Sequence, residues 1–593
     1  MRYDEWTSLP AMFFEQAQTG DDRPFMWAKH NGQYQALSWR ETATQVRHLA
    51  AGLRALGMER GDRVVLVSEN RPEWGIADIA IMSAGGITVP AYTTNTTRDH
   101  RHILSDSGAR GVIVSTRALA QQLLPAVQEC RAVEFVIALG DVASGAFDTP
   151  IHSWFDVLAQ GEAASDDIDD IVASLSRTDV ACLIYTSGTG GNPKGVMLRH
   201  ESLMLNCKGA CALLQKLGIG NDIFLSFLPL SHAYEHTAGL FFPISIDAQI
   251  YYAESVEKLS ENLLEARPTV MISVPRLYDV LRARILSAVN QRGGLKAHLF
   301  LKAVALGTRE HEHPGSLNPA YRVLNRLLDR LVRRKVQQRF GGRLKAMISG
   351  GAALNPEVGT FFTALGVRLL QGYGQTEAGP VISCNEPDSV NLNSVGPPLL
   401  GVDLKLADDG EILVSGPLVM EGYWNDPDAT AAALRDGWLH TGDIGRIDDA
   451  GRIRITDRKK DIIVLSGGDN LSPQRVEGML TLQPEIAQAM VIGDSKPHLA
   501  ALIVPDNDFI NAWCETHGKA ASLDALHNDP AFVKSLSACV DRTNIDLSPI
   551  ERVKKFLVAR DAFTVSNQQM TPTLKVRRHK VAEIYGEDLN ALY

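Results

Sequence analysis

Short apolar and β-branched runs alternate with helical patterns through the first 380 residues, and this alternation limits the folds open to the chain. A helical pattern at 73–83, for example, follows the first run. The runs expected to form strands lie at 63–67, 111–115, 135–138, 180–185, 270–273, 346–349 and 367–370. Strands that alternate with helices usually pair in parallel, because each helix carries the chain back along the sheet. The pattern predicts a layered α/β architecture with largely parallel βαβ sheets.

The pattern changes after about residue 391, where short strand-like pieces are separated by glycine and Asp-Gly turns. These pieces lie at 403–406, 411–414 and 452–455. They predict a small antiparallel or β-barrel-like subdomain over about 391–457. A separate α/β segment follows the charged residues 457–461. We therefore expect an N-terminal domain over 1–459 and a smaller α+β domain over 460–593.

Length, charge and cysteine content restrict the class of protein. The 593 residues are too many for one compact core and fit about two to four domains. A formal net charge of −10 argues against nucleic acid as a partner, because phosphate polymers attract a net basic face. The seven cysteines form no C-x-x-C pair, and no apolar signal or spanning segment is visible. We expect reduced thiols and a cytoplasmic protein.

A stretch rich in glycine and hydroxyl groups, YTSGTGGNPKG at 185–195, follows an apolar run. Glycines let backbone N–H groups approach phosphate oxygens, and Lys194 adds positive charge. A Walker A loop requires G-x-x-x-x-G-K-[ST], whereas here Pro193 precedes the lysine and Gly195 follows it. We expect a loop that closes over nucleotide phosphates. The missing [ST] disfavours a P-loop kinase, and the absence of a G-x-S-x-G elbow disfavours a serine hydrolase.

This loop resembles the signature of the adenylate-forming superfamily, which includes acyl-CoA synthetases, peptide-synthetase adenylation domains and firefly luciferase. Other segments resemble the family's motifs in the same order along most of the chain. They are the acyl-pocket motif LPLSHAYEH at 228–236, the adenine segment SGGAA at 349–353, QGYGQTE at 371–377, WLHTGD at 438–443, the hinge motif DRKKD at 457–461 and the C-terminal lysine motif TPTLKVRR at 571–578. Their shared order makes the resemblance specific.

The resemblance implies an enzyme that uses ATP and Mg²⁺ to form an acyl adenylate and then passes the acyl group to coenzyme A. It implies that the domain at 460–593 is a mobile lid that rotates about Lys460. Glu377 and Thr189 match the metal-binding positions, and their hard oxygens suit Mg²⁺. The positions implied to bind ATP are Thr186, Ser187, Gly188, Thr189, Gly190, Gly191, Lys194, Gly351, Ala352, Gln371, Gly372, Tyr373, Gly374, Thr376, Asp443 and Arg458.

Three residues are expected to take part in the chemistry. Lys575 is expected to serve the first half-reaction, because a compact ammonium can bridge the carboxylate and the α-phosphate as they meet. Lys194 is expected to bind the phosphates, and His232 is expected to steer the carboxylate or stack beside the adenylate. The loop that contains Gly467 and Gly468 is implied to line the path of the thiol after the lid has rotated.

Three features resemble long-chain fatty acyl-CoA synthetases in particular: the SHAYEH form of the pocket motif, the TPTLK ending and a long insertion at about 281–342. Fatty acid, ATP and coenzyme A are therefore the expected substrates. A fatty acyl-AMP ligase that serves a carrier-protein phosphopantetheine is the alternative. A luciferase-like oxygenase and a non-catalytic sensor are weaker alternatives, since no oxidisable substrate is indicated and a sensor has no need of Lys575. The sequence specifies neither acyl-chain length nor oligomeric state.

A basic stretch at 321–340 lies within this insertion. Its basic residues are Arg322, Arg326, Arg330, Arg333, Arg334, Lys335 and Arg339, and Asp329 is the one acid nearby. Apolar residues recur at helical spacing at Val323, Leu324, Leu327, Leu328, Leu331 and Val336. This pattern predicts a basic amphipathic helix. Two interpretations are open: a surface helix packed on the domain, or a peripheral contact with anionic lipid at the inner membrane face.

Overall fold

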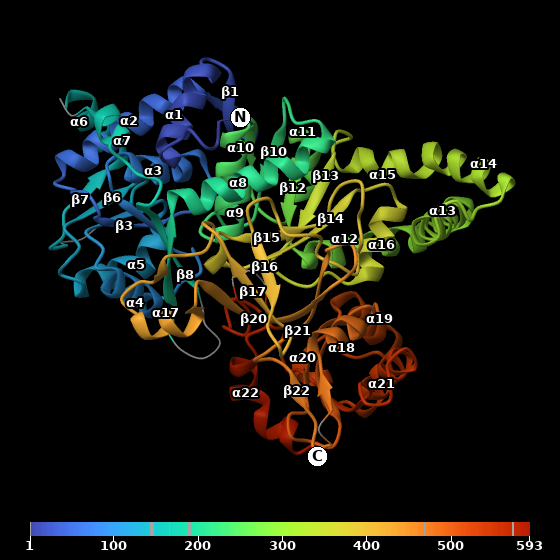
Figure 1. Ribbon diagram of the computed structural model, residues 1–593. Coiled ribbons are helices and arrows are strands. Elements are labelled where there is room, and N and C mark those ends of the chain that lie inside the picture. Colours follow the sequence, from blue (N-terminus) through green and yellow to red (C-terminus); the bar gives the residue numbers. More distant parts are fainter. Residues whose placement is uncertain (1, 143–146, 165–166, 187–191, 468, 572–574) are drawn as a thin grey trace. The chain divides into compact units, whose positions relative to one another are not determined.

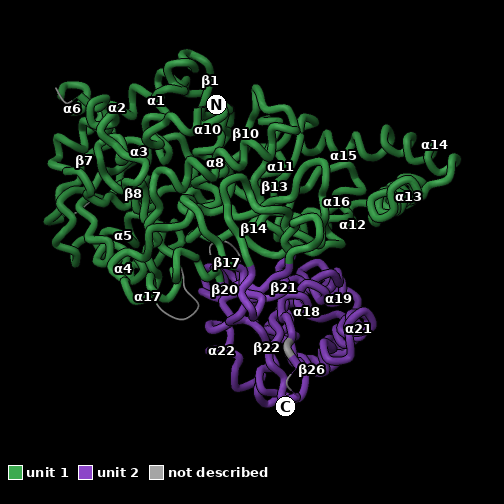
Figure 2. The backbone as a smooth tube through the Cα atoms, in the orientation of Figure 1, with its two compact units in different colours: residues 1–405, 413–441, 447–453 green, residues 406–412, 442–446, 454–593 purple. Residues whose placement is uncertain are grey.

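The computed structural model describes residues 2–142, 147–164, 167–186, 192–467, 469–571 and 575–593 (Figure 1). Contacts divide the chain into two compact units (Figure 2). Unit 1 contains residues 1–405, 413–441 and 447–453, and unit 2 contains residues 406–412, 442–446 and 454–593. Helices and sheets alternate in both units, so the predicted α/β class with a large N-terminal part and a separate C-terminal part is confirmed.

The first sheet of unit 1 has eight strands in the order β15-β14-β13-β12-β10-β11-β1-β2. Its central strands are parallel, and its two edge pairs, β14–β15 and β1–β2, are antiparallel. The strands are β1 (Pro24–His30), β2 (Gln33–Ser38), β10 (Ile223–Ser226), β11 (Gln249–Tyr252), β12 (Val270–Ser273), β13 (Ala346–Ser349), β14 (Leu369–Gly374) and β15 (Val381–Cys384). Every residue of β10, β12 and β13 is buried, as expected for parallel strands covered on both faces.

The second sheet of unit 1 also has eight strands, in the order β18-β9-β8-β4-β3-β5-β6-β7. The six strands β8, β4, β3, β5, β6 and β7 are parallel to one another. Strand β9 pairs antiparallel with β8, and β18 pairs antiparallel with β9. The strands are β3 (Arg63–Val67), β4 (Ile87–Pro90), β5 (Gly111–Val114), β6 (Phe135–Ala138), β7 (Ile151–Ser153), β8 (Val180–Thr186), β9 (Lys194–Arg199) and β18 (Gly422–Tyr423). All strands expected in the first 380 residues are present.

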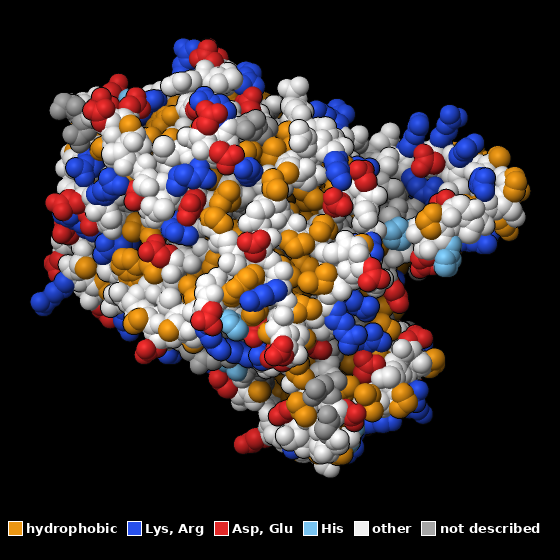
Figure 3. Space-filling view, in the orientation of Figure 1, with side chains coloured by type: hydrophobic (Ala, Val, Ile, Leu, Met, Phe, Trp, Pro, Cys, Tyr) orange, Lys and Arg blue, Asp and Glu red, His pale blue; other side chains and the backbone are white. Residues whose placement is uncertain are grey.

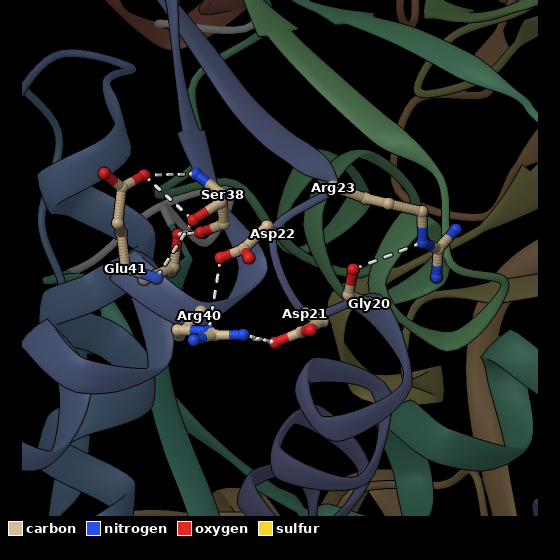
Figure 4. A network of polar contacts seen from close by, with 8 residues as sticks. Gly20, Asp21, Asp22, Arg23, Ser38, Arg40 and Glu41 are labelled. Carbon is tan, nitrogen blue, oxygen red and sulfur yellow. Dashed lines mark hydrogen bonds and ion pairs between the residues drawn. The ribbon is translucent and has the colours of Figure 1, made fainter.

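Helices connect and cover these sheets. They are α1 (Leu9–Gly20), α2 (Trp39–Ala55), α3 (Pro72–Ser83), α4 (Thr97–Ser107), α5 (Arg117–Glu129), α6 (Trp154–Ala163), α7 (Ile168–Ala173), α8 (His200–Leu214), α9 (Ala233–Glu235), α10 (Phe242–Ser245), α11 (Leu259–Ala266), α16 (Pro356–Ala364) and α17 (Pro427–Ala433). Local sequence fixes several helix starts. At α2, Ser38 Oγ accepts the N–H of Glu41 at 3.1 Å, and Glu41 Oε2 accepts the N–H of Ser38 at 2.8 Å (Figure 4). This reciprocal capping satisfies donors at a helix start that have no partner within the helix.

The apolar stretch near residue 80 forms α3 and β4, with a turn at Gly85 (φ +84°) between them. Helix α3 is buried over nearly its whole length between neighbouring elements. No helix among the described residues has the length and apolar character needed to cross a bilayer. None of the seven cysteines, all of which are described, forms a disulfide.

The predicted insertion is a set of helices that extends from the rest of unit 1 (Figure 1). It consists of α12 (Pro275–Arg292), α13 (Gly294–Glu312), α14 (Pro319–Leu328), the π-helical turn η3 (Asp329–Arg333) and α15 (Arg334–Arg339). A small core of its own holds it together, formed by Ala303, Leu306, Leu317 and Leu328 with Leu299, Leu324 and Val332 packed against it.

The stretch predicted as a basic helix at 321–340 is helical through α14, η3 and α15, and the structure adds two details of its packing. Arg333 is buried, and its guanidinium donates to the carbonyl of Ala364 at 2.6 Å and to that of Ala303 at 2.9 Å. The apolar residues do not share one packed face: Leu324 and Leu328 pack inward, whereas Val323 is 67% exposed.

The strands expected after residue 391 belong to a five-stranded sheet in the order β16-β17-β20-β19, with β21 paired to β20. These strands are β16 (Asp403–Leu406), β17 (Glu411–Ser415), β19 (Leu434–Arg435), β20 (Trp438–Ile447) and β21 (Ile453–Arg458). The C-terminal part adds β22 (Ile463–Val464) paired with β23 (Asn470–Leu471), and a three-stranded sheet of β24 (Ile486–Ile492), β25 (Leu499–Pro505) and β26 (Val553–Val558). Its helices are α18 (Pro473–Leu480), α19 (Asn507–His517), α20 (Leu523–Leu526), α21 (Pro530–Ile545) and α22 (Arg578–Asn590).

Candidate active site

Four adjacent parallel strands, β10, β12, β13 and β14, end at one edge of the first sheet, and the expected site residues of unit 1 outside the glycine-rich loop lie in β14 or after the ends of β10, β13 and β14. His232 lies in the loop after β10, and Gly351 and Ala352 follow β13. Tyr373 lies at the end of β14, and Glu377 follows it in a short 3-10 turn. The carboxyl edge of a parallel sheet is where α/β proteins usually bind ligands, because the loops there diverge and leave a crevice.

The segment at 349–353 is shaped by close approaches that only glycine allows. A Cβ on Gly350 would lie 2.8 Å from Cζ of Tyr234, whose hydroxyl donates to the carbonyl of Ile348 at 3.1 Å. Gly351 has φ +82°, in the left-handed region that glycine favours. Tyr234 therefore fixes the start of this turn and ties it to the segment that carries His232.

Strand β14 supplies a buried polar atom that can accept a hydrogen bond from a ligand. Gln371 is 7% exposed, and its Oε1 has no hydrogen-bond partner among the described residues. A buried acceptor without a partner is costly, so a ligand donor that reaches it would be favoured. Gly374 leaves no room for a side chain, since a Cβ there would lie 1.9 Å from the carbonyl oxygen of Pro380. Thr376 is nearly buried in the 3-10 turn Thr376–Ala378, and Tyr373 and Gly372 lie before it on β14.

The glycine-rich loop joins two strands of the second sheet and does not open a helix, in agreement with the exclusion of a Walker A loop. Thr186 at the end of β8 pairs with Lys194 at the start of β9. His102 Nε2 lies 2.7 Å from the carbonyl oxygen of Pro193 and anchors the returning arm. Five residues expected to bind phosphate or metal lie outside the described residues: Ser187, Gly188, Thr189, Gly190 and Gly191.

Lys194 and Glu377, expected from separate motifs, share a neighbour. The Tyr423 hydroxyl donates to Oε1 of Glu377 at 2.9 Å, and Nζ of Lys194 lies 5.2 Å from the centre of the Tyr423 ring. Lys194 also pairs with Asp426 at 3.0 Å. Both partners of this ion pair are more than a third exposed, so water screens their attraction and the pair holds Lys194 only weakly.

Electrostatics at this cluster follow from its contacts. Burial, and after it the Glu377 carboxylate, raises the pKa of Tyr423 well above its usual value, so the phenol stays protonated and donates. The N–H of Ala429, and after it Lys194, lowers the pKa of Asp426. Sequence reasoning missed both Tyr423 and Asp426. Asp426-Pro427 carries a helix-start signal, but no local spacing links Tyr423 to Glu377.

His232 begins the short helix α9 and is held by backbone contacts. Its backbone N–H donates to the carbonyl of Pro229 at 2.9 Å, and its ring Nδ1 accepts the backbone N–H of Tyr234 at 3.2 Å. With Nδ1 as an acceptor, the neutral ring carries its proton on Nε2.

Unit 2 contains the remaining residues expected to bind nucleotide. Arg458 Nε lies 3.2 Å from Oδ1 of Asp443, which is 8% exposed. Lys460 is exposed in a turn closed by the N–H of Asp461, which donates to the carbonyl of Arg458 at 2.8 Å. Gly467 is exposed in the β22–β23 turn, and Gly468 lies outside the described residues.

Lys575 lies in a narrow hairpin of unit 2. The Thr571 N–H donates to the Lys575 carbonyl at 2.8 Å, and the Lys575 N–H donates to Thr571 Oγ1 at 3.0 Å. Residues 572–574 between them lie outside the described residues. A bridge between Met570 and Val576 closes the hairpin, and the Lys575 side chain is exposed. The backbone of this lysine is thus held by Thr571 in the hairpin.

The described side chains fit Mg²⁺ only as a site that substrate phosphates and water complete. Among the described residues no three His, Cys, Asp or Glu side chains form a metal cluster. Mg²⁺ is commonly held by one or two carboxylates together with substrate phosphates and water. Glu377 is partly exposed beside Lys194 and offers one carboxylate of this kind, whereas a fully protein-enclosed site does not fit. Thr189, the second expected ligand, is not described.

Comparisons with known proteins cover nearly the whole chain. The sequence profile of the AMP-binding enzymes matches residues 13–424, and that of the AMP-binding enzyme C-terminal domain matches 460–593. The chain is 34% identical to long-chain-fatty-acid–CoA ligase FadD15 of Mycobacterium bovis, over 99% of this chain and 97% of that protein. It is 28% identical to the chloroplastic long-chain-fatty-acid–[acyl-carrier-protein] ligase AEE15 of Arabidopsis thaliana, over 100% of this chain and 88% of that protein.

A solved structure has the same fold. The A domain of carboxylic acid reductase from Segniliparus rugosus, in complex with AMP and a co-purified carboxylic acid, matches with a TM-score of 0.78 at 21% identity. The match covers 99% of this chain and 94% of that chain.

Proposed function

This chain belongs to the family of AMP-binding enzymes, and from that membership we propose that it is an ATP- and Mg²⁺-dependent long-chain fatty acid–CoA ligase. It converts a fatty acid to an acyl adenylate with release of pyrophosphate, and then to acyl-CoA with release of AMP. The observation that carries this proposal is the identity of 34% to a ligase of that name over 97% of its length. The arrangement of Lys194, Tyr423 and Glu377 supports it, because it suits a nucleotide triphosphate.

In the first half-reaction a carboxylate oxygen forms a bond to the α-phosphorus of ATP, and the bond from that phosphorus to the bridging oxygen breaks. Negative charge gathers on the transferring group, so catalysis depends on positioned positive charge. Lys194 binds the outgoing phosphates, and Lys575 bridges the carboxylate and the α-phosphate. His232 orients the carboxylate through Nε2. Magnesium held by Glu377 and Thr189 would neutralise phosphate charge when bound.

The nucleoside is held by residues from several segments. Gly351, Ala352 and Tyr373 accommodate adenine, and the Gln371 side chain accepts a donor from the base. Gly372 and Gly374 have no side chain and so let the backbone of β14 come close to the nucleoside. Asp443 accepts from the ribose hydroxyls, with Arg458 holding its carboxylate in place. Thr376 and Thr186 donate to phosphate oxygens, together with the loop residues 187–191.

In the second half-reaction the thiol sulfur of coenzyme A forms a bond to the acyl carbon, AMP leaves, and the thiol proton passes to solvent. The thiol must approach from a side that Lys575 does not occupy. We propose that the C-terminal domain, 460–593, turns about Lys460, whose exposed turn can absorb a change in backbone dihedral angles. The loop with Gly467 and Gly468 then lines the thiol path.

We expect AMP release with palmitate to depend on coenzyme A. Without an acceptor, the adenylate stays bound in the closed site and about one equivalent of pyrophosphate is released per enzyme. With coenzyme A, turnover continues. The measurement is AMP and pyrophosphate release by the purified full chain, across fatty acids of increasing length. The similarity to AEE15 keeps the carrier-protein alternative open, and turnover with a phosphopantetheinylated carrier but not with coenzyme A would select it.

We further propose a cytoplasmic enzyme with a peripheral membrane contact through the basic helix at 321–340. The exposed side of α14, η3 and the start of α15 carries two parallel stripes of side chains. The apolar stripe is Val323 (67% exposed), Leu327 (51%) and Leu331 (42%). The basic stripe beside it is Arg322, Arg326, Arg330 and Arg334, all exposed. In Figure 3 basic and hydrophobic side chains gather at the outer end of this insertion. Anionic phospholipid is the partner that matches both stripes.

Replacing Arg326 and Arg330 with glutamine should weaken binding to phosphatidylglycerol vesicles about 30-fold, since each basic residue near an anionic surface contributes about 1 kcal/mol. Sedimentation with vesicles measures this. The matched control is Arg98→Gln with Arg131→Gln, two exposed arginines elsewhere in unit 1. Equal binding of the wild type to pure phosphatidylcholine, or equal loss in the control, would contradict the proposal.

A further inference from the structure

A line of hydrogen bonds, partly buried at Asn70 and fully buried at Glu235, underlies the segment that carries His232. Asn70, just after β3, donates from Nδ2 to Ser226 Oγ at 3.0 Å. Ser226, the last residue of β10, donates from Oγ to Oε1 of Glu235 at 2.7 Å. The line thus starts beside one sheet of unit 1, crosses the end of a strand of the other and stops in α9. His232 lies between Ser226 and Glu235 in the chain.

Asn70 also holds both sides of the intervening loop. Its Nδ2 donates to the carbonyl of Leu228 at 2.6 Å, and its Oδ1 accepts the N–H of Leu230 at 3.1 Å. A primary amide is the side chain that can donate and accept at once in this way. The two bonds fix the loop two and four residues before His232.

Glu235 closes the line from the other side. It is 1% exposed, and its Oε2 has no partner among the described residues. Gly239 makes room for it, because a Cβ at that position would lie 2.5 Å from Cδ of Glu235. A buried acid with an oxygen that lacks a partner among these described residues has a structural cost. A function that needs this geometry would explain why the acid is kept.

We propose that Asn70, Ser226 and Glu235 are positioning residues that hold His232 in place for adenylation. None of the three is expected to touch substrate; each acts through the loop at 227–232. The inference rests on the proposed function, since it assigns His232 to the adenylation step. A displacement of about 1 Å in such a group can lower a rate about 10²-fold.

A double-mutant cycle tests this coupling. His232→Ala should lower the rate of ATP–pyrophosphate exchange with palmitate, and Asn70→Ala should lower it about tenfold or more through misplacement. Asn70→Ala should then have no further effect when His232 is already alanine, because coupled residues are not additive. Additive losses, or an unchanged rate in His232→Ala, would overturn the proposal. A wild type that fails to adenylate any fatty acid would instead refute the proposed function.

Conservative and control variants separate positioning from folding. Glu235→Gln keeps an oxygen that can accept from Ser226, so this variant should retain most of the rate of ATP–pyrophosphate exchange. Ser226→Ala breaks the line of hydrogen bonds, so this variant should lose most of that rate. The control is Asp222→Asn at the opposite end of β10. Asp222 is also buried, and it accepts from Thr269 Oγ1 at 2.6 Å. If Asp222→Asn lowers the exchange rate as much as Ser226→Ala does, at matched thermal stability, then the line of hydrogen bonds does not position His232 for adenylation.

The pH profile gives a second measurement. Burial raises the pKa of Glu235 to about 8, so below that pH the side chain is mostly neutral and the line is intact. Ionisation above about pH 8 places a charge at the buried end of this line. The ionisable side chains packed nearby are Tyr234, Tyr252, Glu73, Asp78 and His236. Exchange by the wild type should fall above about pH 8, and exchange by Glu235→Gln should not; an identical fall in both would contradict the role of the neutral acid.

Discussion

Replacing Lys575 with alanine is expected to lower the rate of fatty acid adenylation about 10²–10³-fold, the usual effect of removing one group that stabilises transition-state charge. Transfer of the acyl group from preformed acyl-AMP to coenzyme A should remain close to wild type. The physical reason is that phosphorus carries the developing charge only in the first step. In the second step the acyl carbon reacts with a thiol, and the proposed lid rotation has moved Lys575 away.

Two assays measure the halves separately: ATP–pyrophosphate exchange with palmitate, and AMP release from synthetic palmitoyl-AMP with coenzyme A. Lys580→Ala is the matched control, because Lys580 lies five residues on and pairs with Glu583 at 2.7 Å. It should leave both rates unchanged. Lys575→Arg should restore little, since a planar guanidinium does not replace a compact ammonium at a bridging position. A similar loss in both half-reactions would refute the rotating lid.

Much of the fold follows from local pattern. The strands at 63–67, 270–273 and 346–349 have the predicted bounds, because buried parallel strands are continuous apolar runs with few alternatives. The strand predicted at 367–370 instead begins at Leu369. Val367 still belongs to the turn after α16, where its N–H donates to the carbonyl of Phe362 at 3.0 Å. Such a boundary depends on a tertiary turn and not on apolar character.

The basic helix shows where periodicity misleads. A constant helical period places Val323, Leu327 and Leu331 with the apolar face, yet all three are exposed. The small core of the insertion takes Leu328 from this stretch, and Leu324 and Val332 pack against it. The π-helical turn η3 adds a residue to the turn and shifts the pattern beyond Asp329. Arg333 is thereby turned inward, where backbone carbonyls satisfy it.

The expected site residues could be found from motifs, but their supporting contacts could not. Lys194 and Glu377 belong to motifs with recognisable chemistry, whereas Tyr423 looks like an ordinary aromatic residue in the sequence. It reaches Glu377 only because β18 pairs with β9, which sets Tyr423 opposite Val196, two residues after Lys194. Asn70 likewise becomes informative only when the ends of β3 and β10 meet. Such contacts depend on pairing between distant segments, which local pattern does not encode.

Changing Glu377 to glutamine is expected to lower Mg²⁺-dependent adenylation about 10²–10³-fold, the magnitude typical of losing one preorganised charge interaction. Glutamine keeps the size of the side chain and an oxygen for the Tyr423 hydroxyl, so the local fold should persist. A neutral amide binds Mg²⁺ far less well than a carboxylate, and the variant should need more Mg²⁺ for half-maximal pyrophosphate release. Mn²⁺ binding followed by electron paramagnetic resonance in the presence of ATP should weaken in parallel.

Two further variants separate the metal role from other roles of the charge. Tyr423→Phe removes a hydrogen bond to a charged group, which contributes about 1.5–3 kcal/mol. The rate of adenylation should therefore fall about 10–100-fold, while the Mg²⁺ concentration needed for half-maximal activity should stay nearly unchanged. Glu386→Gln is the control, an exposed carboxylate of unit 1 that pairs with Lys216 at 3.1 Å, and it should have no effect. If Glu377→Gln turned over normally at ordinary Mg²⁺, the metal would have to be held without this carboxylate. The triphosphate would then lie elsewhere than beside Lys194 and Tyr423.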